Sequence, residues 1–265
     1  MSKLSTIFYL VRERPVNVLV WKFYCKLFNA TIPKFKNWLE LVKGKSGLEI
    51  GGPSGMFALN GYMPLYAVIQ SLDGVNFSTN TLWEENLNEG SSYKFGDRTG
   101  FQFIGEGTDL GIIPNGSYDF VLSCNNLEHI ANPIKAIFEW KRVMNEQGIL
   151  LLILPRKESN FDHRRSITKI DHLIDDYKKN IAEDDLTHLD EILKLHDLTR
   201  DPHAGLFEQF KKRSQNNLDN RGLHHHVYDQ ALLRNIATYA GLKSILHYSS
   251  PTDHFIALSK ITVNS

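Results

Sequence analysis

The sequence predicts an α/β protein in which a parallel β-sheet is covered by helices on both faces. Two observations support this prediction. Short apolar runs of strand length alternate with segments whose apolar residues recur at helical spacing. The glycine-rich turn Gly51-Gly52-Pro53-Ser54-Gly55 directly follows the first such run, which is where open α/β sheets bind ligands. With 265 residues, 42% of them hydrophobic, the chain is long enough for one large domain with an insertion.

The individual elements follow from the same patterns. Helical spacing over residues 15–42 predicts two helices that are separated near Pro33 and pack on the domain. Further helices are expected at 133–145 and 230–239. Strands are expected at 48–50, 66–71, 101–104, 118–123, 149–154, 243–248 and 254–258. Strands that alternate with helices in this way favour parallel pairing.

These patterns divide the chain into four parts. Residues 1–45 form an N-terminal helical segment, and residues 46–155 form a core of strands and helices. Residues 156–227, which we call the insertion, are polar and helical, without a strand pattern, and hold eight of the eleven histidines. Residues 228–265 return to the core with a helix and the last two strands.

Charge and cysteine content limit the function. Thirty basic residues balance thirty acidic ones, so no overall field attracts a phosphate backbone, and we expect no nucleic-acid partner. Cys25 and Cys124 lie in different contexts and do not indicate a disulfide framework, so a cytoplasmic location is expected.

The first 28 residues contain two apolar runs interrupted by charges. These runs are too short and too charged for a signal peptide or an integral membrane segment. A helix packed on the domain is the favoured interpretation, and an amphipathic helix at a membrane surface is the alternative.

Three predicted strand ends carry groups suited to one extended ligand. The turn after Glu49 lets the backbone approach a ligand closely, although a tight turn without a ligand has the same pattern. It is not a Walker loop, because no Gly-Lys-Ser/Thr follows, and it is not a G-x-G-x-x-G motif, because Pro53 interrupts it. Asp73 follows the second predicted strand and can accept hydrogen bonds from ribose hydroxyls. Glu106 follows the third and would lie beside a base.

A series of short motifs extends from the fourth predicted strand to the fifth. In order, they are Tyr118-Asp119, Leu127-Glu128-His129, Asn132-Pro133, Arg142-Val143-Met144 and Gly148. Their order and spacing resemble those of class I S-adenosylmethionine-dependent methyltransferases, in particular a type-11-like bacterial branch. The resemblance covers residues 46–155. It implies a Rossmann-like seven-stranded sheet with an antiparallel last strand and a site for S-adenosylmethionine along the carboxyl edge.

The resemblance also implies roles for particular residues, all of them at strand ends. The spacing around Asp73 departs from the family pattern, which makes the ribose assignment the weakest. Residues matched to the cofactor site are Glu49, Gly51, Gly52 and Pro53 around the methionine and ribose, Asp73 at the ribose, Glu106 and Gly107 at the adenine, and Cys124, Asn125, Asn126 and His129 in the loop under the sulfonium.

The insertion is expected to hold the methyl acceptor. Histidine is the side chain best suited to act as a general base near neutral pH, and the candidates are His163, His224, His225 and His226. Structural hydrogen bonding is the competing role for each. We predict O-methylation of a small polar or carbohydrate acceptor, because the acids, amides, histidines and aromatics of the insertion suit a polyhydroxylated molecule. The resemblance to the bacterial branch implies a surface-glycan or secondary-metabolite pathway, and thus a link to polysaccharide biosynthesis.

Two other roles for polar residues of this region stay open. The alternating histidines could converge with Glu128 and His129 on a divalent ion, but Asn125 replaces an acid that metal-binding relatives use, so the sequence favours no metal. Four arginines could hold an anionic acceptor or form salt bridges within the insertion: Arg164, Arg165, Arg200 and Arg221.

Three other functions compete with this prediction. Methylation of nucleic-acid bases is disfavoured because Cys124-Asn125-Asn126-Leu127 replaces the tetrad typical of those enzymes. An NAD-dependent oxidoreductase would need pyrophosphate contacts, and Pro53 removes an amide donor from the turn. A cofactor-binding scaffold or sensor without turnover is the third.

Overall fold

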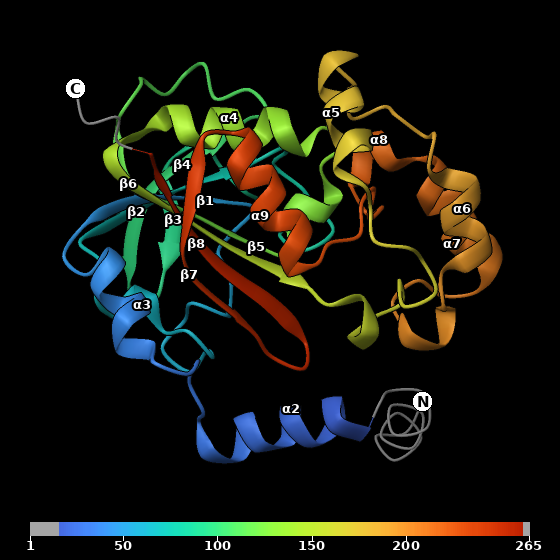
Figure 1. Cartoon of the computed structure of the whole chain (residues 1–265), viewed down its shortest axis with the longest axis horizontal. Coiled ribbons are helices and arrows are strands. Elements are labelled where there is room, and N and C mark those ends of the chain that lie inside the picture. The colour runs from blue at the N-terminus through green and yellow to red at the C-terminus, as the bar shows by residue number, and fades with distance from the viewer. Residues whose placement is uncertain (1–15, 262–265) are drawn as a thin grey trace.

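The computed structural model describes residues 16–261, which are built around one eight-stranded sheet (Figure 1). The strand order is β3-β4-β2-β1-β5-β6-β8-β7. The strands are β1 (Ser46–Ile50), β2 (Ser71–Asn76), β3 (Gly90–Phe95), β4 (Arg98–Ile104), β5 (Tyr118–Cys124), β6 (Met144–Pro155), β7 (Leu242–Ser249) and β8 (Asp253–Lys260).

The pairing confirms the predicted class. Strands β4, β2, β1, β5 and β6 are mutually parallel, and β8 pairs antiparallel with β6. The sheet has one strand more than predicted, because β3 forms an antiparallel hairpin with β4. Strand β1 lies between β2 and β5. The carboxyl ends of these two parallel strands therefore flank the turn that follows β1.

Apolar layers on both faces of the sheet explain its stability. Along β6, Leu150, Leu152 and Leu154 belong to one buried cluster, and Leu151 and Ile153 to the other, as the two-residue period of a strand requires. Helices α4 (Pro133–Val143) and α9 (Gln230–Tyr239) cover the first face, and α3 (Phe35–Val42) covers the second (Figure 1). The start of α4 is fixed by the Asn132 side chain, which accepts a hydrogen bond from Lys135 N at 3.1 Å.

The position predicted for the second strand is wrong. Residues 66–71 form no strand, because Leu65–Ala67 is a 3₁₀ turn (η1) and the strand begins at Ser71. Asp73 and Gly74 weaken the β-propensity of the true strand, but pairing with both β1 and β4 outweighs that preference. At Gly74 a Cβ atom would lie 2.0 Å from the Tyr93 ring, so glycine is needed there for packing.

Helix α2 (Val16–Phe28) is less buried than its apolar pattern predicts. Val18 is buried, and the Trp21 ring contacts the Tyr62 ring at 5.5 Å between centroids. Other apolar side chains of α2 are exposed, among them Val20 and Leu27. The part of the N-terminal prediction that concerns residues 1–15 lies outside the described residues. Within residues 16–261, no helix has the length and apolar character needed to cross a bilayer.

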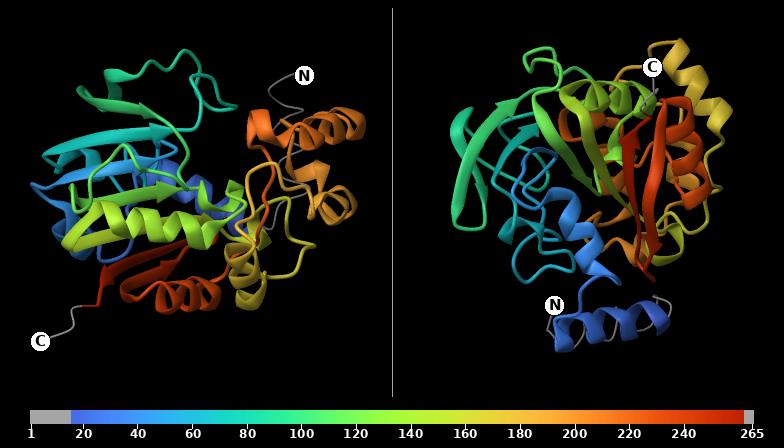
Figure 2. Two further views of the ribbon diagram at one scale, coloured as in Figure 1. Left: turned by 90° about the horizontal axis from the view of Figure 1, so that it is seen from above. Right: turned by 60° about the vertical axis from the view of Figure 1, so that its left-hand side comes forward.

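The insertion lies beyond the carboxyl ends of the strands, as Figure 2 shows. It contains α5 (Ile170–Lys178), α6 (Leu189–Leu195), α7 (Phe207–Gln215) and α8 (Asn217–Asn220), and its residues, all of them described, form no strand. Its own apolar cluster is small, with Ile192, Ala204, Phe210 and Leu223 at the centre. The predicted helical character is therefore confirmed, whereas the division into four domains stays a prediction.

Candidate active site

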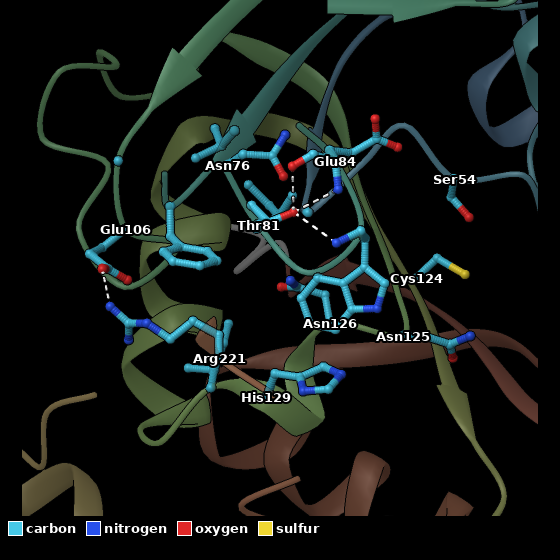
Figure 3. A pocket seen from close by; sticks show the side chains of 18 of the residues that line it. Ser54, Asn76, Thr81, Glu84, Glu106, Cys124, Asn125, Asn126, His129 and Arg221 are labelled. Carbon is cyan, nitrogen blue, oxygen red and sulfur yellow. Dashed lines mark hydrogen bonds and ion pairs between the residues drawn. The ribbon is translucent and has the colours of Figure 1, made fainter. Parts of the chain in front are cut away.

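A cavity of about 310 Å³ opens at the carboxyl ends of β1, β2, β4 and β5 (Figure 3). A pocket of this size is at the lower end of the range that small molecules and cofactors occupy. The described residues that line it are Ile50, Gly51, Pro53, Ser54, Val75, Asn76, Phe77, Thr81, Trp83, Glu84, Gly105, Glu106, Gly107, Thr108, Cys124, Asn125, Asn126, His129, Ile130, Glu183 and Arg221.

The turn after β1 is shaped by close contacts at two glycines. Gly51 has a φ of +75°, and a Cβ atom there would lie 2.3 Å from Asn126 Nδ2. A Cβ atom on Gly52 would lie 2.2 Å from the Tyr93 hydroxyl. Gly51 and Pro53 line the cavity as predicted, whereas Gly52 packs against protein side chains behind it.

Glu49 also lies behind the turn rather than in the cavity. Its carboxylate accepts hydrogen bonds from Tyr66 Oη at 2.6 Å, Tyr93 Oη at 2.7 Å and Ser54 N at 3.0 Å. Burial raises the pKa of Glu49 to about 7, and these hydrogen bonds oppose the shift. In the structure, therefore, Glu49 holds the turn through Ser54 and is not among the cavity residues.

Asp73 does not occupy the place predicted for it. It lies within β2, not after it, and its carboxylate accepts hydrogen bonds from Phe101 N at 2.7 Å and Tyr118 Oη at 2.8 Å. The prediction that Asp73 follows the strand is wrong because the strand was placed too early. The true end of β2 brings Asn76 and Phe77 to the cavity instead.

The end of β4 carries an ion-pair network that spans the cavity wall. Arg221 contacts Glu106 at 2.6 Å, as Figure 3 shows. It also contacts Glu183 at 2.9 Å, and its guanidinium lies 5.0 Å from the centre of the Phe77 ring. Burial raises the pKa of Glu183 to about 7, and the charge of Arg221 opposes that shift. Gly107 is fixed through its carbonyl, which accepts a hydrogen bond from Trp140 Nε1 at 2.8 Å.

The loop after β5 contributes Cys124, Asn125, Asn126 and His129 to the cavity. His129 is half-buried, and its Nδ1 lies 3.0 Å from the carbonyl oxygen of Leu223. Because a carbonyl only accepts, this contact assigns the proton of the neutral ring to Nδ1 and leaves Nε2 as an acceptor. Burial, and next the charge of His224, lower the pKa of His129 well below its usual range. Asn126 Oδ1 is buried without a hydrogen-bond partner among the described residues.

The four histidines predicted as catalytic bases lie outside the cavity lining. Protein groups hold each of them: the Asp197 carboxylate is 2.8 Å from His163, the Asp162 carboxylate 2.5 Å from His224, the Asn217 amide 3.1 Å from His225, and the Ala131 carbonyl 3.1 Å from His226. Their competing structural role explains these contacts better than base catalysis does.

His224 still reaches the cavity indirectly. Its ring lies edge to face with His129, 4.6 Å between centroids, and a ligand atom from each of Glu128, His129 and His224 lies within 4.8 Å of the others. Attraction to Asp162 outweighs burial and raises the pKa of His224.

A second wall of the cavity consists of residues that were not predicted from the sequence. Thr81, Trp83 and Glu84 come from the loop between β2 and β3, and Glu183 comes from the insertion. The Trp83 ring packs edge to face with His129 at 4.9 Å. No periodicity or motif marks this loop, although an isolated Trp in a polar stretch is a weak signal for a binding surface.

Comparison with known families identifies the class of protein that has this fold and cavity. A family model described as a methyltransferase domain matches residues 22–247. The chain belongs to this family, and it is a class I methyltransferase that depends on S-adenosylmethionine.

The solved structures that resemble this chain share little of its sequence. An S-adenosylmethionine-dependent methyltransferase from Aquifex aeolicus is 13% identical over 87% of this chain and 90% of that chain, with a TM-score of 0.44. The YcgJ protein from Bacillus subtilis is 12% identical over 86% and 98%, with a TM-score of 0.44. The methyltransferase CalH, in complex with S-adenosylhomocysteine, is 12% identical over 86% and 55%, with a TM-score of 0.45. A search of the curated proteins finds no match.

The cavity suits the chemistry of this cofactor, which carries a cationic sulfonium and no phosphate. Arg221 is the one Lys or Arg among the described residues that line it, and two carboxylates already neutralise its charge. The wall also carries Glu84 and the unpartnered Asn126 Oδ1, which can accept hydrogen bonds from amino or hydroxyl groups.

Proposed function

We propose that this methyltransferase transfers a methyl group to a hydroxyl of a small polar or carbohydrate acceptor, with His129 as the general base. The observation that carries the proposal is the position of His129. It is the one histidine among the described cavity residues, and its contact with the Leu223 carbonyl leaves Nε2 free to accept a proton.

The cofactor residues are assigned as follows. Gly51 and Pro53 lie beside the methionine portion, and Glu106 and Gly107 lie beside the adenine, as the resemblance implies. Asn76 and Glu84 replace Asp73 as the groups for the ribose hydroxyls, because they line the cavity near the end of β2 and Asp73 does not. When bound, S-adenosylmethionine supplies an electrophilic methyl group on its sulfonium.

The electrostatics of His129 suit its proposed role. Its lowered pKa keeps the imidazole neutral at neutral pH but makes it a weak base, so the ring takes the proton only as the methyl–oxygen bond forms and the hydroxyl becomes strongly acidic. A neutral ring also avoids repulsion of the cationic cofactor. His224 is then a positioning residue, because it packs on His129 and is itself held by Asp162.

Polar groups and an exposed aromatic ring support a hydroxylated acceptor. Trp83 is 56% exposed at the cavity and offers an aromatic face, and Thr81 and Asn125 add hydrogen-bonding groups beside it. This mixture fits a sugar ring better than a flat, apolar acceptor. Family membership favours S-adenosylmethionine over the nicotinamide cofactor of the alternative function.

A methyl-transfer screen tests the proposal. The purified chain is incubated with S-adenosylmethionine labelled at the methyl group and with nucleotide sugars, glycans, sugar acids and matched amines. We expect methyl ethers on a hydroxylated acceptor. Transfer to amines alone would refute O-methylation, and cofactor binding without any turnover would support the scaffold function instead.

The role of His129 is tested with the acceptor found in that screen. His129→Ala should lower the rate of transfer by about 10²- to 10⁴-fold, the usual contribution of a general base. Calorimetry should show that the variant binds S-adenosylmethionine as the wild type does. His203→Ala, at an exposed histidine of the insertion, is the matched control. Normal turnover by His129→Ala would exclude base catalysis by this residue.

A further inference from the structure

A second cluster of histidines lies outside the cavity. His172 and Asp176 are on α5, His188 is the N-cap residue of α6, and His226 lies in the extended segment before α9. One ligand atom from each of these four residues lies within 4.8 Å of the other three. We call them the His₃Asp cluster. Its members are all absent from the cavity lining, and none belongs to the group of Glu128, His129 and His224.

The distances within the cluster are those of an almost formed metal site. His172 Nε2 lies 3.0 Å from His188 Nε2 and 3.2 Å from Asp176 Oδ2, and a ligand atom of His226 lies within 4.8 Å of all three residues. Bonds of about 2.0–2.1 Å to a tetrahedral zinc ion place neighbouring ligand atoms about 3.3 Å apart. Small side-chain movements therefore suffice to place the four atoms around one ion.

The sequence positions of two ligands support the same geometry. His172 and Asp176 are four residues apart on α5, so both side chains project from one face of the helix. This spacing is also how helices present paired ligands to zinc. The other two ligands come from separate segments of the insertion, so their convergence is a property of the tertiary structure.

Two polar atoms in the cluster, Asp176 Oδ2 and His226 Nδ1, are buried without a hydrogen bond among the described residues. Because His226 Nε2 lies 3.1 Å from the Ala131 carbonyl, the proton of the neutral ring is on Nε2, and Nδ1 is the nitrogen that can bind an ion. Each unpartnered buried polar atom costs about 1–3 kcal/mol.

Surrounding groups hold the cluster in place. Glu191 Oε2 lies 3.9 Å from His188 Nδ1, and the backbone carbonyl of Asp176 accepts a hydrogen bond from Asn132 Nδ2 at 3.3 Å. Outer contacts of this kind orient the ligands of metal sites. The side chain of His172 is 40% exposed, which gives an ion a route from solvent.

We propose that His172, Asp176, His188 and His226 bind a structural Zn²⁺ ion with four protein ligands. Three imidazoles and one carboxylate form a ligand set that zinc accepts, and four protein ligands leave no open position for catalysis. The ion ties α5 and α6 to the segment that contains His226. In that segment His225 N donates to the Glu128 carbonyl at 2.8 Å, so the ion braces the loop that carries His129.

Metal analysis of the full chain tests this proposal. Protein purified with equimolar ZnSO₄ present should retain one Zn²⁺ per chain, measured by inductively coupled plasma mass spectrometry. His188→Ala and Asp176→Asn should each weaken zinc affinity by more than about 100-fold, because they remove direct ligands. His203→Ala should bind zinc as the wild type does. Retention of zinc by His188→Ala, or its loss in His129→Ala instead, would overturn the assignment.

Two measurements on the wild-type chain keep the test independent of whether the variants fold. X-ray absorption at the zinc edge should show four nitrogen or oxygen ligands and no sulfur. Removal of the ion with a chelator should lower the melting temperature, and Zn²⁺ but not Mg²⁺ should restore it. A sulfur ligand, or a wild-type chain that binds no zinc, would refute the proposal. None of these readouts depends on the methyl acceptor, so the proposal can fail while the proposed function stands.

Discussion

The sheet core and the insertion are stabilised by different interactions. The two faces of the sheet bury large apolar clusters, to which each central strand contributes alternate residues. The insertion has a small apolar cluster, and its buried polar side chains include Asp162, Arg165, Asp176 and the three histidines 224–226. An element can therefore be buried without an apolar pattern when ion pairs and hydrogen bonds satisfy its polar groups.

Arg165 is the clearest example of this difference. Its side chain is 2% exposed, and it lies 3.0 Å from the Asp162 carboxylate. It also donates to the carbonyls of His224 at 2.7 Å and His225 at 3.0 Å. A single guanidinium therefore joins the start of the insertion to the segment at its end.

Removal of this guanidinium should have the largest effect on stability. Arg165→Met leaves Asp162 buried without its arginine partner, and should lower the free energy of unfolding by about 3–5 kcal/mol. Urea denaturation measures the loss. The neighbouring Arg164 is the matched control, because its side chain is 51% exposed in its pair with Asp197. Arg164→Ala should change stability by less than about 1 kcal/mol. Equal losses of stability in the two variants would contradict the larger contribution expected of the buried arginine.

Truncation in the two apolar clusters should separate global from local stability. Leu150→Ala, in the middle of β6, should cost about 2–5 kcal/mol and increase hydrogen exchange throughout the sheet. Ile192→Ala, in the cluster of the insertion, should increase exchange mainly within residues 156–227. Exchange that rises equally in both regions after Ile192→Ala would mean that they unfold as one unit.

The two regions should also respond to pH with opposite sign. Burial raises the pKa of Glu49 from 4.5 to about 7, so the folded chain binds this proton more tightly than the unfolded chain does. The contribution of Glu49 to stability is present below about pH 4.5 and is lost as pH rises through 7. At about 1.4 kcal/mol per pKa unit, the loss is about 3 kcal/mol. The unfolding free energy of Glu49→Gln, measured by denaturation at several pH values, should lack this decrease.

In the insertion, Asp162 affects stability with the opposite pH dependence. Burial alone would raise the pKa of Asp162, but the charges and hydrogen bonds of His224 and Arg165 outweigh it and lower the pKa from 3.8 to about 2. The stability that Asp162 contributes is therefore present above about pH 3.8 and lost as pH falls through 2. Hydrogen exchange should increase in residues 156–227 first on acidification. Earlier loss of protection in β1 would contradict this order.

The smallest predicted effect concerns the turn after β1. Gly51→Ala places a side chain at a φ of +75° and against Asn126, and the backbone strain alone costs about 1–2 kcal/mol. We expect S-adenosylmethionine to bind about tenfold more weakly, as measured by calorimetry. Gly55→Ala is the control, because a Cβ atom there meets nothing within 4 Å. Equal affinities of the two variants would remove Gly51 from the binding site.

Much of the cavity could be predicted because its residues follow strands. Gly51, Glu106, Cys124 and His129 reach it from the ends of β1, β4 and β5, and these strands have clear apolar patterns. The prediction that Asp73 follows the second strand is wrong because β2 contains Asp and Gly and was placed five residues too early. Trp83 and Glu183 could not be predicted, since their loops carry no period and reach the cavity only through folding.

The histidines predicted as bases also show what the sequence alone could not decide. A row of three histidines, 224–226, indicates chemistry at the sequence level, but each ring meets a different partner. In the structure His224 contacts Asp162 and His129, whereas His226 is a member of the His₃Asp cluster.

By itself, the sequence determined the α/β class and the parallel core, because strand and helix periods are local patterns. Its ordered motifs carried the resemblance to the family, which in turn implied the antiparallel last strand. The tertiary structure alone decided which histidine faces the cavity, where Arg221 finds its carboxylates, and which four side chains form the His₃Asp cluster. The physical reason is the range of the interactions. Apolar burial repeats along the chain and is visible in it, whereas an ion pair or a ligand set joins atoms that only folding brings within a few ångströms.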